Sequence, residues 1–289
     1  KLITLNHHLC HAYSVFYSSP YDRAAVLVVD GRGSEKETQS LYVADKNEGI
    51  KLISTTNKIG IGLLYAAVTQ KIGFKLLQEG KTMGLAPYGK DVDKNFIDFI
   101  GVFNGIETSY EEVCVDGSYE MNIECDPIVT FEDQAKVAFE VQEECEKAML
   151  HLANYAKEET GCEYLCIAGG VGLNSVANNK ILRSEIFKDI FINPACSDTG
   201  IPIGAALFGF HSLAKKEKTY SDISPYIGPE YSTEDIILAI NAYDGYQVIS
   251  KNAFKEAAKI VNKGSILGFF HGRSEMGPRA LGNRSIIMS

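Results

Sequence analysis

The apolar run at residues 24–29, AAVLVV, constrains the fold more than any other feature; it ends at Asp30 and is followed by GRGS. A strand with both faces buried is a continuous apolar run, whereas a strand with one wet face alternates. The run therefore predicts a central strand in a sheet covered on both sides by helices, which is an α/β fold. A second apolar segment at 40–44, SLYVA, predicts a hairpin over 24–44.

Two further segments repeat a strand followed by a glycine-containing turn and a helix. EYLCIA (163–168) leads into GGVGLNS, and DIFIN (189–193) leads into PACSDTG. Between them and the hairpin, residues 131–160 carry an apolar stripe at helical spacing, with Gly161 as the predicted stop. Residues 60–73 predict a short helix. The Gly, Asn, Asp and Pro content of 104–130 predicts an irregular lobe.

Later segments predict a second, smaller domain. The helix IPIGAALFGFHSLAKK, which begins at Ile201, is expected to end in its lysine-rich turn. The composition changes at residues 214–232, which are rich in charged residues, Pro, Ser and Tyr. This change predicts a linker between domains at 1–213 and 233–289. Beyond it, STEDIILAI has a capping-box start, NAFKEAAKIVNKG is amphipathic and SILGFF predicts a strand.

Composition restricts the partners. The 289 residues carry a net charge of −9 and a sequence pI near 5.3, which argues against duplex DNA or an anionic membrane as a partner. The longest apolar runs fall well short of a membrane span. Seven cysteines without a CxxC pair predict reduced thiols and a cytoplasmic location. The start at Lys1, without signal- or transit-peptide features, and the end at Ser289 predict a piece excised from a longer protein.

The first chemical constellation is HHLCH at 7–11. On a helix His7 and His11 lie on one face, close enough for one metal ion, while His8 points elsewhere. Carboxylates that could complete a site are Asp30, at the end of the buried strand, and Asp198, in the turn CSDTG. This donor set suits Fe(II), Mn(II) or Zn(II). The alternative is hydrogen-bonded histidines, with each aspartate as a helix cap or turn residue.

Three other constellations could bind phosphates. The turn Gly169, Gly170, Val171, Gly172 can aim backbone amides at a nucleotide, with Asn174 beside it, although a plain tight turn is equally consistent. EGKTMGLAPYG (79–89) predicts an unusual loop in which Lys81 holds a phosphate and Glu79 orients it; the alternative is a surface ion pair. HGRSEMGPRALGNR (271–284) concentrates arginines that suit phosphate or carboxylate, or forms a solvated charged loop.

Together these motifs resemble the O-carbamoyltransferases of the nodulation and antibiotic-tailoring type. The likeness is carried in the family's order by HHLCHA (7–12), VVDGRG (28–33), EGKTMGLAPYG (79–89), GGVGLNSVANNKI (169–181), ACSDTGIPIGAAL (195–207) and GRSEMGPRALGNRSI (272–286). The resemblance implies a Kae1-like domain of the actin/sugar-kinase (ASKHA) ATPase fold at 1–213. It also implies the truncated start of a YrdC-like α/β domain at 233–289.

The resemblance further implies the reaction and its residues. The second domain activates carbamoyl phosphate with ATP to carbamoyl-adenylate, releasing pyrophosphate, and the first transfers the carbamoyl group to a hydroxyl of a small molecule such as a sugar or an aminoglycoside. The implied assignments are metal ligands, with iron(II) expected, at His7, His11, Asp30 and Asp198; nucleotide contacts at Gly169, Gly170, Val171 and Asn174; active-site roles at Glu79 and Lys81; and phosphate contacts at Arg273, Arg279 and Arg284.

Three other interpretations stay open at this point. A tRNA threonylcarbamoyl-transfer protein shares the first domain, but it lacks a fused activating domain and the acidic charge disfavours tRNA. A sugar kinase shares the fold, but the paired histidines disfavour it. A metal- or nucleotide-binding scaffold without activity is the third. The family's N-terminal strand pair, with its histidine base, is not found in the sequence, so this piece alone is not expected to complete a turnover; a homodimer is allowed.

Overall fold

The computed structural model describes residues 2–111, 113–115, 121–219, 224–245 and 252–289. The chain forms two compact units, Lys1–Asp222 and Ile223–Ser289. The change from one unit to the other falls inside the segment 214–232, where the sequence loses its apolar pattern.

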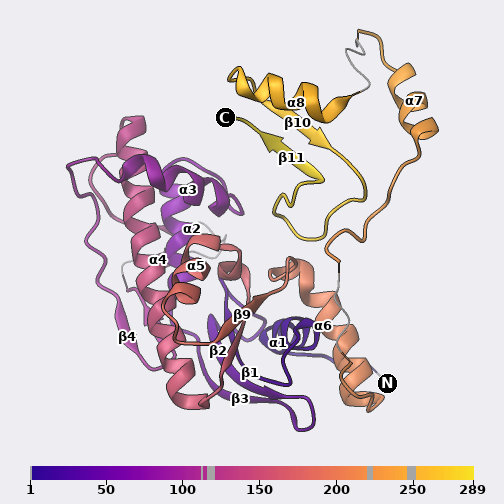
Figure 1. Ribbon diagram of the computed structural model, residues 1–289. Coiled ribbons are helices and arrows are strands. Elements are labelled where there is room, and N and C mark those ends of the chain that lie inside the picture. The colour runs from indigo at the N-terminus through magenta and orange to yellow at the C-terminus, as the bar shows by residue number, and fades with distance from the viewer. Residues whose placement is uncertain (1, 112, 116–120, 220–223, 246–251) are drawn as a thin grey trace. The chain divides into compact units, whose positions relative to one another are not determined.

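The first unit is built on a five-stranded sheet in the order β3-β2-β1-β8-β9 (Figure 1). The strands are β1 (Arg23–Val29), β2 (Gln39–Asp45), β3 (Gly49–Thr56), β8 (Tyr164–Ala168) and β9 (Asp189–Ile192). β1 is antiparallel to β2, which confirms the predicted hairpin, and parallel to β8, which is parallel to β9. Because β1, β8 and β9 run the same way, the turns that follow them meet at one edge of the sheet.

Helices cover both faces of this sheet, as the apolar run predicted. Ala25, Leu27 and Val29 of β1 join a core with α2 (Ile61–Lys71), α4 (Phe131–Thr160) and α5 (Ser175–Arg183). The alternate residues Ala24, Val26 and Val28 pack on the other side, against α1 (His7–Ser18) and the end of α6 (Ile201–Phe208). The result is a helix–sheet–helix sandwich, because successive strand residues point to opposite faces.

The long helix α4 is placed as the sequence predicted. Thr130 caps it by accepting a hydrogen bond from the Asp133 backbone N–H, and the Asp133 carboxylate accepts one from the Thr130 N–H in return. The helix ends at Gly161, whose φ of +60° is left-handed and therefore favours glycine. Before α4, the described residues of the irregular segment form short strand pairs, namely β4 (Val102–Asn104) with β5 (Glu107–Ser109) and β6 (Cys114–Val115) with β7 (Met121–Asn122).

The predicted loop at 79–89 is wrong. It forms α3 (Glu79–Leu85), followed by a 3-10 turn at Ala86–Gly89. Packing on α4 accounts for this, since a Cβ added to Gly89 would lie 2.1 Å from the Ala135 carbonyl oxygen. Tertiary contact thus overrides the low helix propensity of glycine. The predicted lysine-rich end of the later helix is wrong as well: α6 continues as a π-helical turn at Gly209–Leu213 and ends before the lysines.

The second unit contains α7 (Thr233–Asn241), α8 (Ala253–Asn262), β10 (Leu267–Phe270) and β11 (Arg284–Ile287). The predicted capping box is confirmed, because Ser232 and Asp235 exchange hydrogen bonds at the start of α7. β10 and β11 form an antiparallel pair. None of the described residues of this unit is buried.

Two expectations from composition concern thiols and membrane helices. Six cysteines with described side chains are free thiols, and five of these are buried. Across the described ranges, the helices lack the combination of length and apolar character that crossing a bilayer requires.

Candidate metal centre

The start of α1 presents two imidazoles at one point. Asn6 begins the helix, since its side-chain Oδ1 accepts a hydrogen bond from the Leu9 N–H at 2.9 Å. His7 and His11 lie one turn apart on the same face, and their Nε2 atoms are 3.1 Å from each other. His8 points away, as predicted: its Nδ1 lies 2.7 Å from the Ser40 Oγ, and burial lowers its pKa to about 4.

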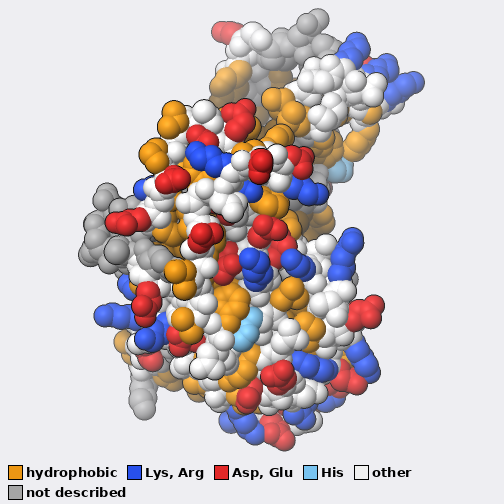
Figure 2. Space-filling view, turned by 90° about the vertical axis from the view of Figure 1, so that its left-hand side faces the viewer, with side chains coloured by type: hydrophobic (Ala, Val, Ile, Leu, Met, Phe, Trp, Pro, Cys, Tyr) orange, Lys and Arg blue, Asp and Glu red, His pale blue; other side chains and the backbone are white. Residues whose placement is uncertain are grey.

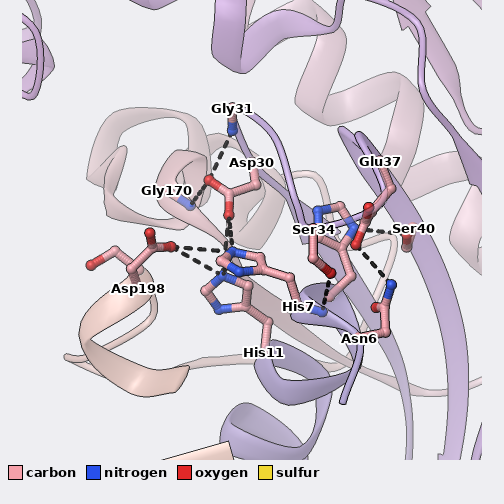
Figure 3. Close-up of polar contacts among 12 residues, drawn as sticks. Asn6, His7, His11, Asp30, Gly31, Ser34, Glu37, Ser40, Gly170 and Asp198 are labelled. Carbon is pink, nitrogen blue, oxygen red and sulfur yellow. Dashed lines mark hydrogen bonds and ion pairs between the residues drawn. The ribbon is translucent and has the colours of Figure 1, made fainter. Parts of the chain in front are cut away.

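Asp30 follows β1 directly and faces these imidazoles (Figure 3). Its Oδ2 lies 3.2 Å from the His7 Nε2 and 3.1 Å from the His11 Nε2. Its Oδ1 accepts hydrogen bonds from the backbone N–H groups of Gly31 and Gly170, at 2.8 and 3.0 Å. One carboxylate oxygen is therefore fixed by the sheet edge, and the other is aimed at the histidines.

Asp198 completes the group from the turn after β9. Its Oδ1 lies 3.3 Å from the His7 Nε2 and 3.6 Å from the His11 Nε2. The helix-cap alternative is not supported, because Ser197 occupies the cap position and no side-chain cap forms there. Packing of α6 on α1 brings this turn close: a Cβ added to Gly204 would lie 1.9 Å from the Cys10 carbonyl oxygen.

The four side chains have the spacing of ligands around one ion. Their ligand atoms all lie within 4.8 Å of one another. Atoms about 2.0–2.2 Å from a shared cation are about 3–3.6 Å apart, and the histidine–histidine and histidine–carboxylate distances run from 3.1 to 3.6 Å. The Asp198 side chain is 77% exposed while that of His11 is fully buried, so the group has a solvent-facing side.

The electrostatics suit a cation. Hydrogen bonds to Asp198 and Asp30 raise the pKa of His7 to about 10. Burial lowers the pKa of His11, but the hydrogen bonds to Asp198 and Asp30 outweigh burial, so the pKa of His11 is also raised. At Asp30 the histidine contacts outweigh burial, and at Asp198 they dominate, so both carboxyl pKa values fall well below their usual range. The two carboxylates thus favour the protonated form of the imidazoles, and a dication can replace such protons.

Comparison with known proteins assigns the chain to a family. The family model described as the carbamoyltransferase N-terminus matches residues 1–207. The chain belongs to the carbamoyltransferase family. The model of the carbamoyltransferase C-terminus matches residues 258–289.

Individual proteins similar to this chain include curated relatives and solved structures. The nodulation protein NolNO of Sinorhizobium fredii is 31% identical over 99% of this chain and 43% of its own length. The Synechocystis protein sll1178 is 36% identical over 99% of this chain and 50% of its own length. Among solved structures, HypF of T. kodakarensis aligns over 74% of this chain and 37% of its own, with a TM-score of 0.49 and 15% identity. The chain spans about half the length of the curated relatives it matches.

In this carbamoyltransferase-family chain, the glycine turn supports the sheet edge. Gly169 has a φ of +90°, and a Cβ there would lie 2.2 Å from the Val29 carbonyl oxygen, so the turn lies directly on the end of β1. The Gly170 N–H is bound to Asp30, and Val171 packs on the core. Asn174 caps α5 and exchanges two hydrogen bonds with Gln142 of α4, of 2.9 and 3.2 Å.

The remaining predicted residues lie outside the four-residue group. The Glu79 carboxylate accepts a hydrogen bond from the Leu77 N–H at 3.3 Å, and the Lys81 ammonium lies 5.6 Å from the centre of the Phe74 ring. Both contacts are local to the turn before α3. The ion pair expected as the alternative for this segment is not among the contacts of the described residues.

The three arginines of the family's C-terminal match lie in the second unit. The guanidinium of Arg284 stacks 3.4 Å from the centre of the Phe270 ring and donates to the carbonyl oxygens of His271, Gly272 and Asn283. Arg273 is half-exposed, 3.9 Å from the Glu230 carboxylate, and Arg279 is partly buried. Arg284 therefore organises the loop itself.

Sequence reasoning missed residues that contact Asn174 and the start of α1. Gln142 lies in the middle of a helix, and its contact with Asn174 spans 32 residues. Asn6 precedes the first histidine and fits the ordinary helix-cap preference, which was the available signal.

Proposed function

We propose that the protein is an O-carbamoyltransferase whose transfer site holds one divalent cation on His7, His11, Asp30 and Asp198. The observation that carries the proposal is the convergence of these four ligand atoms within 4.8 Å, at the edge of the sheet where the parallel strands end. The carbamoyltransferase family match over residues 1–207 supports the reaction class. Two imidazoles and two carboxylates suit Fe(II), Mn(II) or Zn(II), and we propose Fe(II).

The bound cation would act as a Lewis acid that polarises a carbamoyl or phosphate oxygen. Backbone amides of the chain fix the direction of one of the proposed ligands, Asp30. Gly31 and Gly170 hold one oxygen of Asp30, so its other oxygen keeps a fixed direction toward the site. Exposure of Asp198 leaves one side of the group open for substrate, as catalytic metal sites require.

The proposed substrates are ATP, carbamoyl phosphate and a hydroxyl-bearing small molecule such as a sugar or an aminoglycoside. Activation consumes one water and yields carbamoyl-adenylate, pyrophosphate from ATP and inorganic phosphate from carbamoyl phosphate. In transfer, the acceptor oxygen bonds to the carbamoyl carbon, the bond from that carbon to AMP breaks, and the hydroxyl proton passes to a base. We propose that Arg273, Arg279 and Arg284 contribute to the phosphate site in the whole protein. Half-exposed Arg273 supports this more directly than Arg284, which already binds three carbonyl oxygens.

We also propose phosphate-facing roles for Lys81 and Glu79 and a nucleotide-facing role for residues 169–174. Lys81 is exposed on a helix. Its ammonium can therefore reach a bound anion without giving up a buried ion pair. The glycine turn brings backbone close to the sheet edge, next to Asp30.

Metal content tests the proposal. Protein purified without oxygen is expected to contain close to one equivalent of metal by plasma emission, and His7→Ala and Asp198→Ala are expected to lose it. His271→Ala and Asp91→Ala remove the same side-chain types at exposed positions elsewhere and should retain the metal. A parent without metal, even after incubation with Fe(II), Mn(II) and Zn(II), would refute the proposed centre.

Pyrophosphate release separates the enzyme from a scaffold. The whole protein, given ATP and carbamoyl phosphate, is expected to release pyrophosphate and to form a carbamoylated acceptor. Metal binding without pyrophosphate release would identify a binding scaffold instead.

A further inference from the structure

The loop between β1 and β2 holds a buried carboxylate outside the ligand group. Asp30 begins this loop, and Glu37 lies near its other end with 6% exposure. Acidic side chains are rarely buried without partners, so the contacts of Glu37 indicate its role. Its Oε1 accepts a hydrogen bond from the Asn6 Nδ2 at 2.9 Å, and its Oε2 accepts one from the Glu35 N–H at 2.7 Å.

Through its contact with Asn6, Glu37 is connected to α1, the helix that carries His7 and His11. The Asn6 amide has two ends: Oδ1 accepts from the Leu9 N–H to start α1, and Nδ2 donates to Glu37. The same loop makes a second contact with the helix, because the Ser34 Oγ accepts from the His7 N–H at 3.2 Å (Figure 3). The β1–β2 loop, which begins with Asp30, thus makes two hydrogen bonds that hold the first turn of α1, which carries His7.

From these contacts we infer that Glu37 is a positioning residue for the metal centre, acting through Asn6 on His7. This inference rests on the proposed metal site. His7 is the first residue of α1, where the helix lacks its own hydrogen bonds and frays most easily. Fixing the Asn6 amide orients that turn, so the His7 Nε2 stays opposite Asp30.

Because Asn6 donates the hydrogen bond and Glu37 accepts it, the two roles can be exchanged in a test. In Glu37→Gln, one amide cannot accept from both the Asn6 Nδ2 and the Glu35 N–H, so one hydrogen bond is lost whichever way it turns. In the double variant Asn6→Asp/Glu37→Gln, the new amide at position 37 donates to the new carboxylate at position 6 and still accepts from the Glu35 N–H. The double variant also keeps the net charge of the parent, and position 6 can still cap Leu9.

Cobalt(II) is the probe, because its visible absorption reports the number and geometry of its ligands. We expect Glu37→Gln to weaken cobalt binding by about 10–100-fold, the usual effect of removing a residue that orients a metal ligand, and to change the spectrum. The double variant should recover the parent's affinity and spectrum. Glu35→Gln, the same change on an exposed side chain of the same loop, is the matched control and should match the parent.

Amide hydrogen exchange in the metal-free protein gives a second readout. Glu37→Gln should speed exchange at Leu9 and Cys10 selectively, and the double variant should restore it. Unchanged cobalt affinity and spectrum in Glu37→Gln would overturn the inference, even if exchange increased, and so would a double variant that rescues neither. A parent that binds no cobalt would refute the proposed metal site; exchange alone would then decide whether Glu37 fixes the turn that carries His7.

Discussion

The candidate metal centre of the first unit and the arginine loop of the second differ in how their charged residues are used. In the first unit, side chains from α1, the end of β1 and the turn before α6 converge, and three of the four residues are buried or partly buried. In the second, Arg284 donates hydrogen bonds to carbonyl oxygens of its own loop, and none of the described residues is buried. Figure 2 shows one face of the molecule, on which Lys, Arg, Asp and Glu side chains lie scattered. Charged residues beside a strand therefore converge where the packing of several elements aims them at one point.

The largest expected effect is at Asp30. Asp30→Asn should abolish metal binding and, without metal, lower the free energy of unfolding by about 3 kcal/mol, because it breaks a buried ion pair. Chemical denaturation and metal analysis measure the two effects.

Asp198→Asn should also lose the metal but lower the free energy of unfolding by less than about 1 kcal/mol, since that side chain is largely exposed. Equal stability losses in the two variants would contradict the packing difference.

The next largest expected effect is the pH dependence of stability and of metal affinity, which should arise in the first unit. The pKa of His7 is raised from its ordinary value of 6.5 to about 10, so its contribution to the stability of the metal-free protein is complete below pH 6.5 and is lost as the pH rises through 10. Metal must displace that proton, so affinity should rise about tenfold per pH unit for each proton released. Calorimetric titration with Mn(II) between pH 6 and 8, in buffers of different ionisation enthalpy, counts the protons. Affinity independent of pH would contradict protonated histidines.

A smaller effect is expected where α6 meets α1. Gly204→Ala places a methyl group against the Cys10 carbonyl oxygen and should destabilise the protein by about 2 kcal/mol, as overpacking does. It should also weaken metal binding by displacing Asp198. Gly209→Ala is the control, because its backbone is helical and its Cβ would meet nothing within 4 Å. Thermal unfolding and metal titration of both variants would show whether this packing sets the ligand turn.

The smallest effect is expected in the arginine loop. Arg284→Lys loses the stacked fork that donates to several carbonyl oxygens and should cost the loop about 1 kcal/mol. Faster hydrogen exchange over residues 271–284 would report it, with no change in metal binding. Arg273→Lys should leave exchange unaltered, because its contact with Glu230 is long and exposed. Similar exchange in both variants would mean that Arg284 does not organise the loop.

Much of the fold was predictable from local patterns. The continuous run of β1, the apolar stripe of α4 and its stop at Gly161 are short-range signals, and all three predictions are confirmed. The prediction at 79–89 failed because glycine and proline content is a local signal, whereas packing on α4 decided the conformation. The helix from Ile201 was predicted correctly in kind but ends before its lysines.

The sequence by itself determined which residues could bind metal: the histidine pair at helical spacing, and aspartates placed after strands. Only the tertiary structure decided that these ligand atoms face one another, since Asp198 and Asp30 come together through parallel pairing of β1, β8 and β9 and the packing of α6 on α1. It also decided which other residues hold them, among them Gly170, 140 residues from Asp30, and Glu37, 31 residues from Asn6. Local periodicity carries no information about such contacts, because they depend on how distant elements pack.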